Sequence, residues 1–275
     1  MNFFKWLFGL FKKPKQIKLG LALGSGGAKG FAELGALKAL EEAGLEFDYV
    51  AGTSIGSIVG AFCCNGYSST DIFEMLKRLD FSEIKNFTML GMDTFGLFSV
   101  VNREIGALNI EELKKPFRAV ATEIESGKEF VFDKGSVAEA VCASCCIPPF
   151  FKPVVINNVR YVDGAYTNSI PADVVKKLGA DYVIGVDLKT ETSKASILSK
   201  IFPTYQTDVK EPWAKGYEFS DVMIHPDLNG YTSLSFNKGS KMYDLGYQCA
   251  IKLIPKIKAE INARSCGKKT FKAEK

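Results

Sequence analysis

The chain has 275 residues, which allows one large domain or two small ones, and its 47% apolar and 24% charged residues are typical of a globular protein with a sizeable core. The formal net charge is only +4, and no basic stripe with interleaved aromatic residues crosses the middle of the chain, so we expect no nucleic-acid binding. Seven cysteines, including two adjacent pairs, accompany a single histidine. That pattern suits neither a zinc site nor a disulfide framework, and we expect no metal.

The first fifteen residues, MNFFKWLFGLFKKPK, form an amphipathic segment. In a helix, one face would carry Phe3, Phe4, Leu7, Phe8 and Phe11. The apolar run is shorter than the ~20 residues that span a bilayer, and it lacks the basic start and cleavage site of a signal peptide. Aromatic residues beside lysines are typical of a helix in the membrane interface, drawn to anionic lipid. A helix packed on the domain, or a frayed terminus, is the alternative.

Strands and helices alternate in the first third of the chain. Buried strands are predicted over residues 17–23 and 49–52, each followed by a glycine-containing turn and a helix, over 31–43 and 55–64. The first helix ends at Gly44 and the second at Asn65-Gly66. This order predicts an α/β fold whose mainly parallel central sheet is covered on both faces.

The rest of the chain continues the mixture. Further strands are predicted over 118–122, 129–132, 182–187 and 222–225, a hairpin over 154–162, and helices over 137–143, 173–178 and 242–261, the last with a bend at Pro255. Residues 79–105 and 189–220 show no clear periodicity and are typical of lids or binding loops, with disorder as the alternative for the second. We expect a folded domain over 16–265, between the segment 1–15 and a basic tail over 266–275.

A glycine-rich loop, Ser25-Gly26-Gly27-Ala28-Lys29-Gly30, follows the first strand. A dinucleotide fingerprint requires Gly-x-Gly-x-x-Gly, and the sequence lacks one of the three glycines whether the motif is counted from Gly24 or from Ser25. The Gly-Lys-Ser/Thr of a phosphate loop is absent. Its backbone N–H groups could instead stabilise the negative oxygen of an ester intermediate, as an oxyanion hole. That use requires a nucleophile at the end of a neighbouring strand.

The second strand ends in Gly52-Thr53-Ser54-Ile55-Gly56, which is the Gly-x-Ser-x-Gly pattern of an exposed nucleophile on a sharp turn. A serine nucleophile needs an adjacent base. His225 is the only histidine, and it follows Ser54 in the order of an α/β-hydrolase triad, although a structural role for it is equally compatible with the pattern. The other candidate is Asp163, which stands before Gly164-Ala165 at a strand end, where a simple turn is the alternative.

Together these motifs resemble the patatin-like phospholipase family, particularly its bacterial branch. Residues 25–30 resemble its oxyanion loop, 52–56 its nucleophile elbow and 163–165 its Asp-Gly-Gly/Ala motif, and the likeness runs from about residue 18 to about 254. Two departures stand out. Ser25 replaces the first glycine of the loop, and Pro149 stands where relatives commonly carry glycine, which would narrow the acyl pocket.

The resemblance implies a three-layer α/β/α fold and hydrolysis of fatty-acyl esters of phospholipids or lysophospholipids, without metal or cofactor. It implies Ser54 as nucleophile and Asp163 as base, with an oxyanion hole from the backbone of Gly26, Gly27 and Ala28. The motif glycines are Gly30, Gly52, Gly56 and Gly164. A catalytically silent lipid-binding protein on the same fold, and a triad esterase that uses His225, are the alternatives.

The expected partners are therefore a lipid ester and, through residues 1–15, an anionic membrane. We expect a cytoplasmic location, with peripheral contact to the inner face of the membrane. The sequence makes no prediction about the oligomeric state.

Overall fold

A mixed β-sheet forms the centre of the part of the chain that the computed structural model describes, which comprises residues 15–78, 94–148, 151–190 and 207–267. Its strands are β1 (Leu19–Leu23), β2 (Tyr49–Thr53), β3 (Phe117–Glu123), β4 (Glu129–Phe132), β5 (Val154–Ile156), β6 (Val159–Asp163), β7 (Tyr182–Val186) and β8 (Val222–Ile224). The strands β3, β2, β1, β7 and β8 pair in parallel in that order, whereas β4, β5 and β6 are joined by antiparallel pairing. The predicted parallel sheet is confirmed, with an antiparallel part built on β3.

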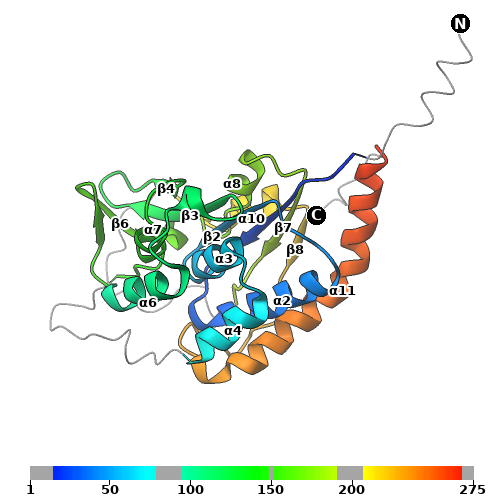
Figure 1. The fold of residues 1–275 in the computed structure, drawn as a ribbon, viewed down its shortest axis with the longest axis horizontal. Coiled ribbons are helices and arrows are strands. Elements are labelled where there is room, and N and C mark those ends of the chain that lie inside the picture. The colour runs from blue at the N-terminus through cyan, green and yellow to red at the C-terminus, as the bar shows by residue number, and fades with distance from the viewer. Residues whose placement is uncertain (1–14, 79–93, 149–150, 191–206, 268–275) are drawn as a thin grey trace, which may run out of the picture.

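Helices cover both faces of this sheet (Figure 1). The described α-helices are α2 (Gly30–Glu42), α3 (Ile55–Asn65), α4 (Ser69–Arg78), α6 (Phe95–Ile105), α7 (Val137–Ser144), α8 (Ala172–Lys177), α10 (Ala214–Phe219) and α11 (Gly239–Ser265). Figure 1 shows the long α11 lying beside α2, with α3 and α4 on the same side. The helices α8 and α10 pack against each other over the other face, where they enclose a second apolar cluster.

The two apolar clusters follow the period-two alternation of the strands. In β1, Leu21 and Leu23 point into the larger cluster beneath α2, α3 and α11, whereas Ala22 points into the smaller cluster beneath α8. The same division places Val50 and Ala51 of β2 in the larger and the smaller cluster, respectively. Successive side chains of a strand point to opposite faces, so two buried faces require a continuous apolar run. The three-layer α/β/α prediction is thus confirmed.

The register around β3 brings two strand ends together. Ala121 pairs with both β4 and β6, and Val120 pairs with both β4 and β2, so β2 and β6 lie on the same side of β3. They approach head to head, because Thr53 lies opposite Val120 and Asp163 lies opposite Ala121. The residue after β2 and the last residue of β6 therefore meet although they are far apart in the sequence.

Three of the described α-helices were not predicted from the sequence. The helix α4 buries Ile72 and Leu76 one turn apart, and α6 buries Leu97, Val101 and Ile105 at helical spacing. The third, α10, lies in the polar segment after residue 189. In the segment 79–105, for which a lid or a binding loop was expected, residues 95–105 thus form a helix packed on α7. Residues 79–93 lie outside the described residues, as do 1–14, Pro149 and 268–275. The predicted division at residues 15 and 265 stays a prediction.

Candidate active site

Ser54 occupies a strained turn between β2 and α3. Its backbone has φ 56° and ψ −126°, a conformation that non-glycine residues rarely adopt and that costs about 1–3 kcal/mol. The turn is tight because a Cβ on Gly52 would lie only 2.1 Å from the carbonyl oxygen of Gly56. Glycine is therefore required where the strand end meets the first turn of the helix. This arrangement is the nucleophile elbow that the Gly-x-Ser-x-Gly pattern predicts.

The Ser54 hydroxyl donates a hydrogen bond of 2.6 Å to Oδ2 of Asp163. Both side chains are buried, with Ser54 4% and Asp163 1% exposed. The other carboxylate oxygen of Asp163 accepts the N–H of Ala165 at 2.8 Å, and the Asp163 N–H donates to the carbonyl of Cys146 at 2.7 Å. The carboxylate is thus held in one orientation, with one oxygen left for the serine.

Burial changes the acid–base properties of Asp163. Loss of water around the carboxylate raises the pKa of Asp163 from 3.8 to about 6, although the hydrogen bonds from Ser54 and Ala165 act in the opposite direction. A carboxylate with a pKa near 6 is a stronger base than an exposed aspartate and is still mostly ionised at pH 7. The pair therefore has the geometry and the proton affinity for a serine activated directly by an aspartate.

The glycine-rich loop lies against the start of α3. The carbonyl oxygen of Gly24, the residue before the loop, would lie 2.8 Å from a Cβ on Gly56. A Cβ on Gly30, the last residue of the loop, would lie 2.2 Å from Ile55. Both ends of the loop thus contact the residues that directly follow Ser54. Among the described residues, none accepts a hydrogen bond from the N–H of Gly26 or Gly27. These two groups are available as oxyanion donors.

Ala28 differs from the prediction. Its N–H donates a 2.9 Å hydrogen bond to the carbonyl of Ser233, in the segment between β8 and α11. An N–H group that is already bonded in this way does not stabilise an oxyanion as well. In this arrangement the candidate donors are reduced from three to Gly26 and Gly27, because a tertiary contact that the motif could not reveal uses the third.

Ser144, which the sequence analysis did not single out, links the elbow to the sheet. Its buried hydroxyl accepts the N–H of Ser54 at 2.8 Å and donates to the carbonyl of Val120 at 2.6 Å. Ser144 is the last residue of α7 and lies outside the three motifs that carry the family resemblance. The motifs therefore gave no signal for it.

A buried acid lies close in sequence to the glycine-rich loop. Glu33, in the first turn of α2, is fully buried, and this burial raises its pKa well above the ordinary value although the N–H of Gly24 favours the carboxylate. This burial favours the protonated, uncharged form of the Glu33 side chain. Lys29 in the loop is also buried, which lowers the pKa of its ammonium group.

His225 does not lie with Ser54. Its Nδ1 atom is 3.2 Å from Oδ2 of Asp187, and hydrogen bonding to Asp187 raises the pKa of His225. These residues follow β8 and β7, and β8 is three strand spacings from β2, or roughly 14 Å. The proton of Ser54 already has its acceptor in Asp163. The triad alternative is therefore wrong for this structure.

Comparison with known proteins identifies the family of the chain. The family model described as "Patatin-like phospholipase" matches residues 21–176, which is just over half of the chain and includes Ser54 and Asp163. The chain belongs to the patatin-like phospholipase family. The predicted resemblance to this family is confirmed.

Individual relatives show how widely this domain is used. The chain is 26% identical over 270 residues to "Neuropathy target esterase sws" of Drosophila melanogaster, covering 83% of this chain and 19% of the relative. It is 26% identical over 281 residues to "Lysophospholipase nte1" of Aspergillus fumigatus, covering 88% and 18%. The chain thus spans about a fifth of the length of these curated relatives.

The fold also resembles solved structures. VipD from Legionella pneumophila matches with a TM-score of 0.58 at 14% identity, over 88% of this chain and 67% of VipD. In the described part of the chain, no helix has the length and apolar character needed to cross a bilayer. The described residues also contain no group of three or more His, Cys, Asp or Glu side chains placed to bind a metal. The expectation of a metal-free reaction stays a prediction.

Proposed function

We propose that this protein is a serine acyl hydrolase that cleaves fatty-acyl esters of phospholipids or lysophospholipids through Ser54 and Asp163. The observation that carries the proposal is the 2.6 Å hydrogen bond between the two buried side chains, on a strained turn beside a glycine-rich loop. Membership of the patatin-like phospholipase family and the similarity to a protein named lysophospholipase support the substrate class.

In the first half of the reaction, Asp163 accepts the hydroxyl proton while Oγ of Ser54 bonds to the ester carbonyl carbon. The negative charge that develops on the carbonyl oxygen is stabilised by the N–H groups of Gly26 and Gly27. Collapse of this intermediate breaks the bond to the alcohol, which takes the proton from Asp163 and leaves. The fatty acyl group remains on Ser54.

In the second half, water replaces the alcohol. Asp163 accepts a proton from the water as the water oxygen attacks the acyl carbon, and the same oxyanion donors act again. The bond to Oγ then breaks, and Ser54 recovers its proton from Asp163 as the fatty acid leaves. One carboxylate thus serves both halves, which requires a base that is ionised at rest and can still donate a proton.

Residues 1–15 would bring the enzyme to its substrate. Their aromatic and lysine pattern supports a peripheral helix on an anionic membrane, and a cytoplasmic location with contact to the inner face of the membrane follows as part of the proposal.

The test is hydrolysis of p-nitrophenyl esters of graded chain length by the wild type, Ser54→Ala and Asp163→Asn, together with labelling by a fluorophosphonate, which reacts with activated serines. We expect activity and labelling in the wild type, neither in Ser54→Ala, and loss of hydrolysis in Asp163→Asn. His225→Ala should behave as the wild type. A folded wild type with no activity and no labelling would instead indicate a lipid-binding protein without turnover.

A further inference from the structure

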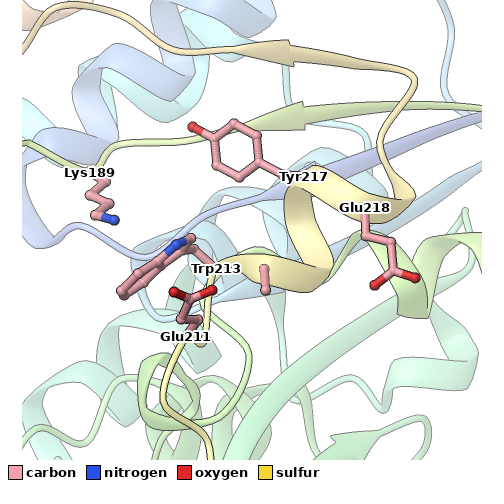
Figure 2. A pocket seen from close by; sticks show the side chains of 6 residues that line it. Lys189, Glu211, Trp213, Tyr217 and Glu218 are labelled. Atoms are coloured by element: carbon pink, nitrogen blue, oxygen red, sulfur yellow. The ribbon is translucent and has the colours of Figure 1, made fainter. Parts of the chain in front are cut away.

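A shallow cavity of about 560 Å³ lies beside the end of β7, outside the Ser54–Asp163 pair. It is lined by Lys189, Glu211, Trp213, Ala214, Tyr217 and Glu218. Figure 2 shows Lys189 reaching in from the segment that follows β7, with Trp213 and Glu211 facing it from the approach to α10. The cavity therefore combines aromatic rings with acidic side chains.

The ammonium group of Lys189 occupies the face of the Trp213 ring. Its Nζ atom is 3.3 Å from the ring centroid. A tryptophan face is the aromatic surface that attracts cations most strongly, and aromatic cages with acidic neighbours are the usual protein sites for organic ammonium ions. With Glu211 and Glu218 also on the wall, the cavity has the chemistry of an ammonium site that the protein fills with its own lysine.

Lys189 also lines a second, neighbouring cavity of about 360 Å³. The wall of this second cavity includes Asp187, Asp227 and Asn229. Rotation of the lysine side chain would move its charge from Trp213 toward these carboxylates and leave the ring face open.

The residues beside both walls of the cavity are linked to the predicted oxyanion loop, one by direct contact and the other through Ser169. Leu188, next to Lys189, packs so closely on the loop that a Cβ on Gly26 would lie 2.8 Å from it. Pro212, next to Trp213, accepts the N–H of Ser169 at 2.8 Å, and the Ser169 carbonyl accepts the N–H of Ser25 at 3.0 Å. The alcohol part of an ester bound at this loop could therefore extend toward Trp213.

We propose that the cavity formed by Trp213, Tyr217 and Glu211 binds a positively charged organic ammonium group in the alcohol part of the substrate, and that this group displaces Lys189. The assignment of the ammonium to the substrate rests on the lipid hydrolase function proposed above. The ability of the cavity to bind an ammonium group depends only on its own side chains. An anionic head group is disfavoured because two carboxylates line the wall.

Equilibrium binding tests the cavity without turnover. Trp213 and Trp6 are the two tryptophans of the chain, so Trp6→Phe combined with Ser54→Ala makes Trp213 the sole tryptophan in an inactive protein. Choline should change its fluorescence, whereas the neutral isostere 3,3-dimethyl-1-butanol should not. In this background, Lys189→Met should bind choline about fivefold more tightly and Glu211→Gln several-fold more weakly, and the exposed control Lys241→Met should leave the affinity unchanged. Equal responses to choline and its isostere, or no effect of Lys189→Met, would overturn the proposal.

Hydrolysis tests the link to the substrate. With lysophospholipids of one acyl chain, Trp213→Leu should lower the preference for a choline over a glycerol head group about tenfold. An increase in KM for the anionic glycerol substrate in Lys189→Met would identify this lysine as a phosphate contact and refute the ammonium assignment. If the wild type hydrolyses no p-nitrophenyl ester, the proposed function fails, while the choline titration still decides whether the cavity binds ammonium.

Discussion

Replacement of Asp163 by asparagine separates catalysis from stability. The variant keeps the size of the side chain: its single oxygen can still accept the N–H of Ala165 while its NH2 group donates to Oγ of Ser54, but it removes the base. We expect hydrolysis of a soluble ester to fall by about 10³-fold or more, since a positioned general base contributes about 10²–10⁴-fold and this one acts in both halves of the proposed reaction. The protein should nevertheless remain folded.

The stability of the Asp163→Asn variant follows from the burial of the carboxylate. The pKa of Asp163 is raised from 3.8 to about 6, so between these pH values the folded protein binds more protons than the unfolded chain. The free energy of unfolding therefore falls as the pH rises from about 4 to about 6. The shift corresponds to about 3 kcal/mol once the carboxylate is fully ionised. Asparagine carries no charge, so the variant should be more stable than the wild type by up to this amount at pH 8, and by less at pH 5.

The test compares thermal melts of the wild type and the variant at pH 5 and pH 8, together with hydrolysis of p-nitrophenyl butyrate at pH 8. Asp173 provides the matched control because it is equally buried, but hydrogen bonds from Lys177 and Asn168 outweigh the effect of burial and lower its pKa. Asp173→Asn should therefore melt lower than the wild type at pH 8 and keep its activity. An active Asp163→Asn, or an inactive one that melts below the wild type at pH 8, would refute the reasoning.

Three further predictions concern the same site, and a fourth concerns the N-terminal segment. Ser54→Ala should be inactive and folded. In denaturant titrations, Ser54→Gly should be about 1 kcal/mol more stable than Ser54→Ala, because glycine adopts the positive φ without strain. Equal stability of the two variants would contradict the strained elbow. Ser144→Ala should lose about 1–3 kcal/mol and lower kcat more than KM, since it leaves the N–H of Ser54 without its acceptor; unchanged kcat would remove its positioning role. In the wild type, kcat/KM should rise with pH through about 6 and then stay level as Asp163 ionises; a midpoint near 4 would mean that the carboxylate is not desolvated. Deletion of residues 1–13 should weaken binding to anionic vesicles in a flotation assay and spare hydrolysis of a soluble ester; unchanged flotation would exclude the membrane role.

Much of the site could be predicted because its parts are local. The turn at Ser54 needs glycine on either side, and the turn after Asp163 needs a small residue, so both leave a motif in the sequence. The missed helix α4 also had a local signal, since Ser68 and Asp71 cap it by reciprocal hydrogen bonds. Local signals of this kind predict an element but not what it contacts.

The sequence by itself determined the alternation of strands and helices, the two buried faces of the sheet, and the positions of the elbow and the glycine-rich loop, since each depends on residues that are neighbours along the chain. Only the tertiary structure decided between Asp163 and His225 as the partner of Ser54. That choice depends on β2 and β6 meeting head to head along β3 while β8 lies on the far side of β1 and β7. The loss of Ala28 as a donor and the placement of Lys189 on Trp213 are likewise contacts between distant segments, which strand order and register create and which no spacing in the sequence encodes.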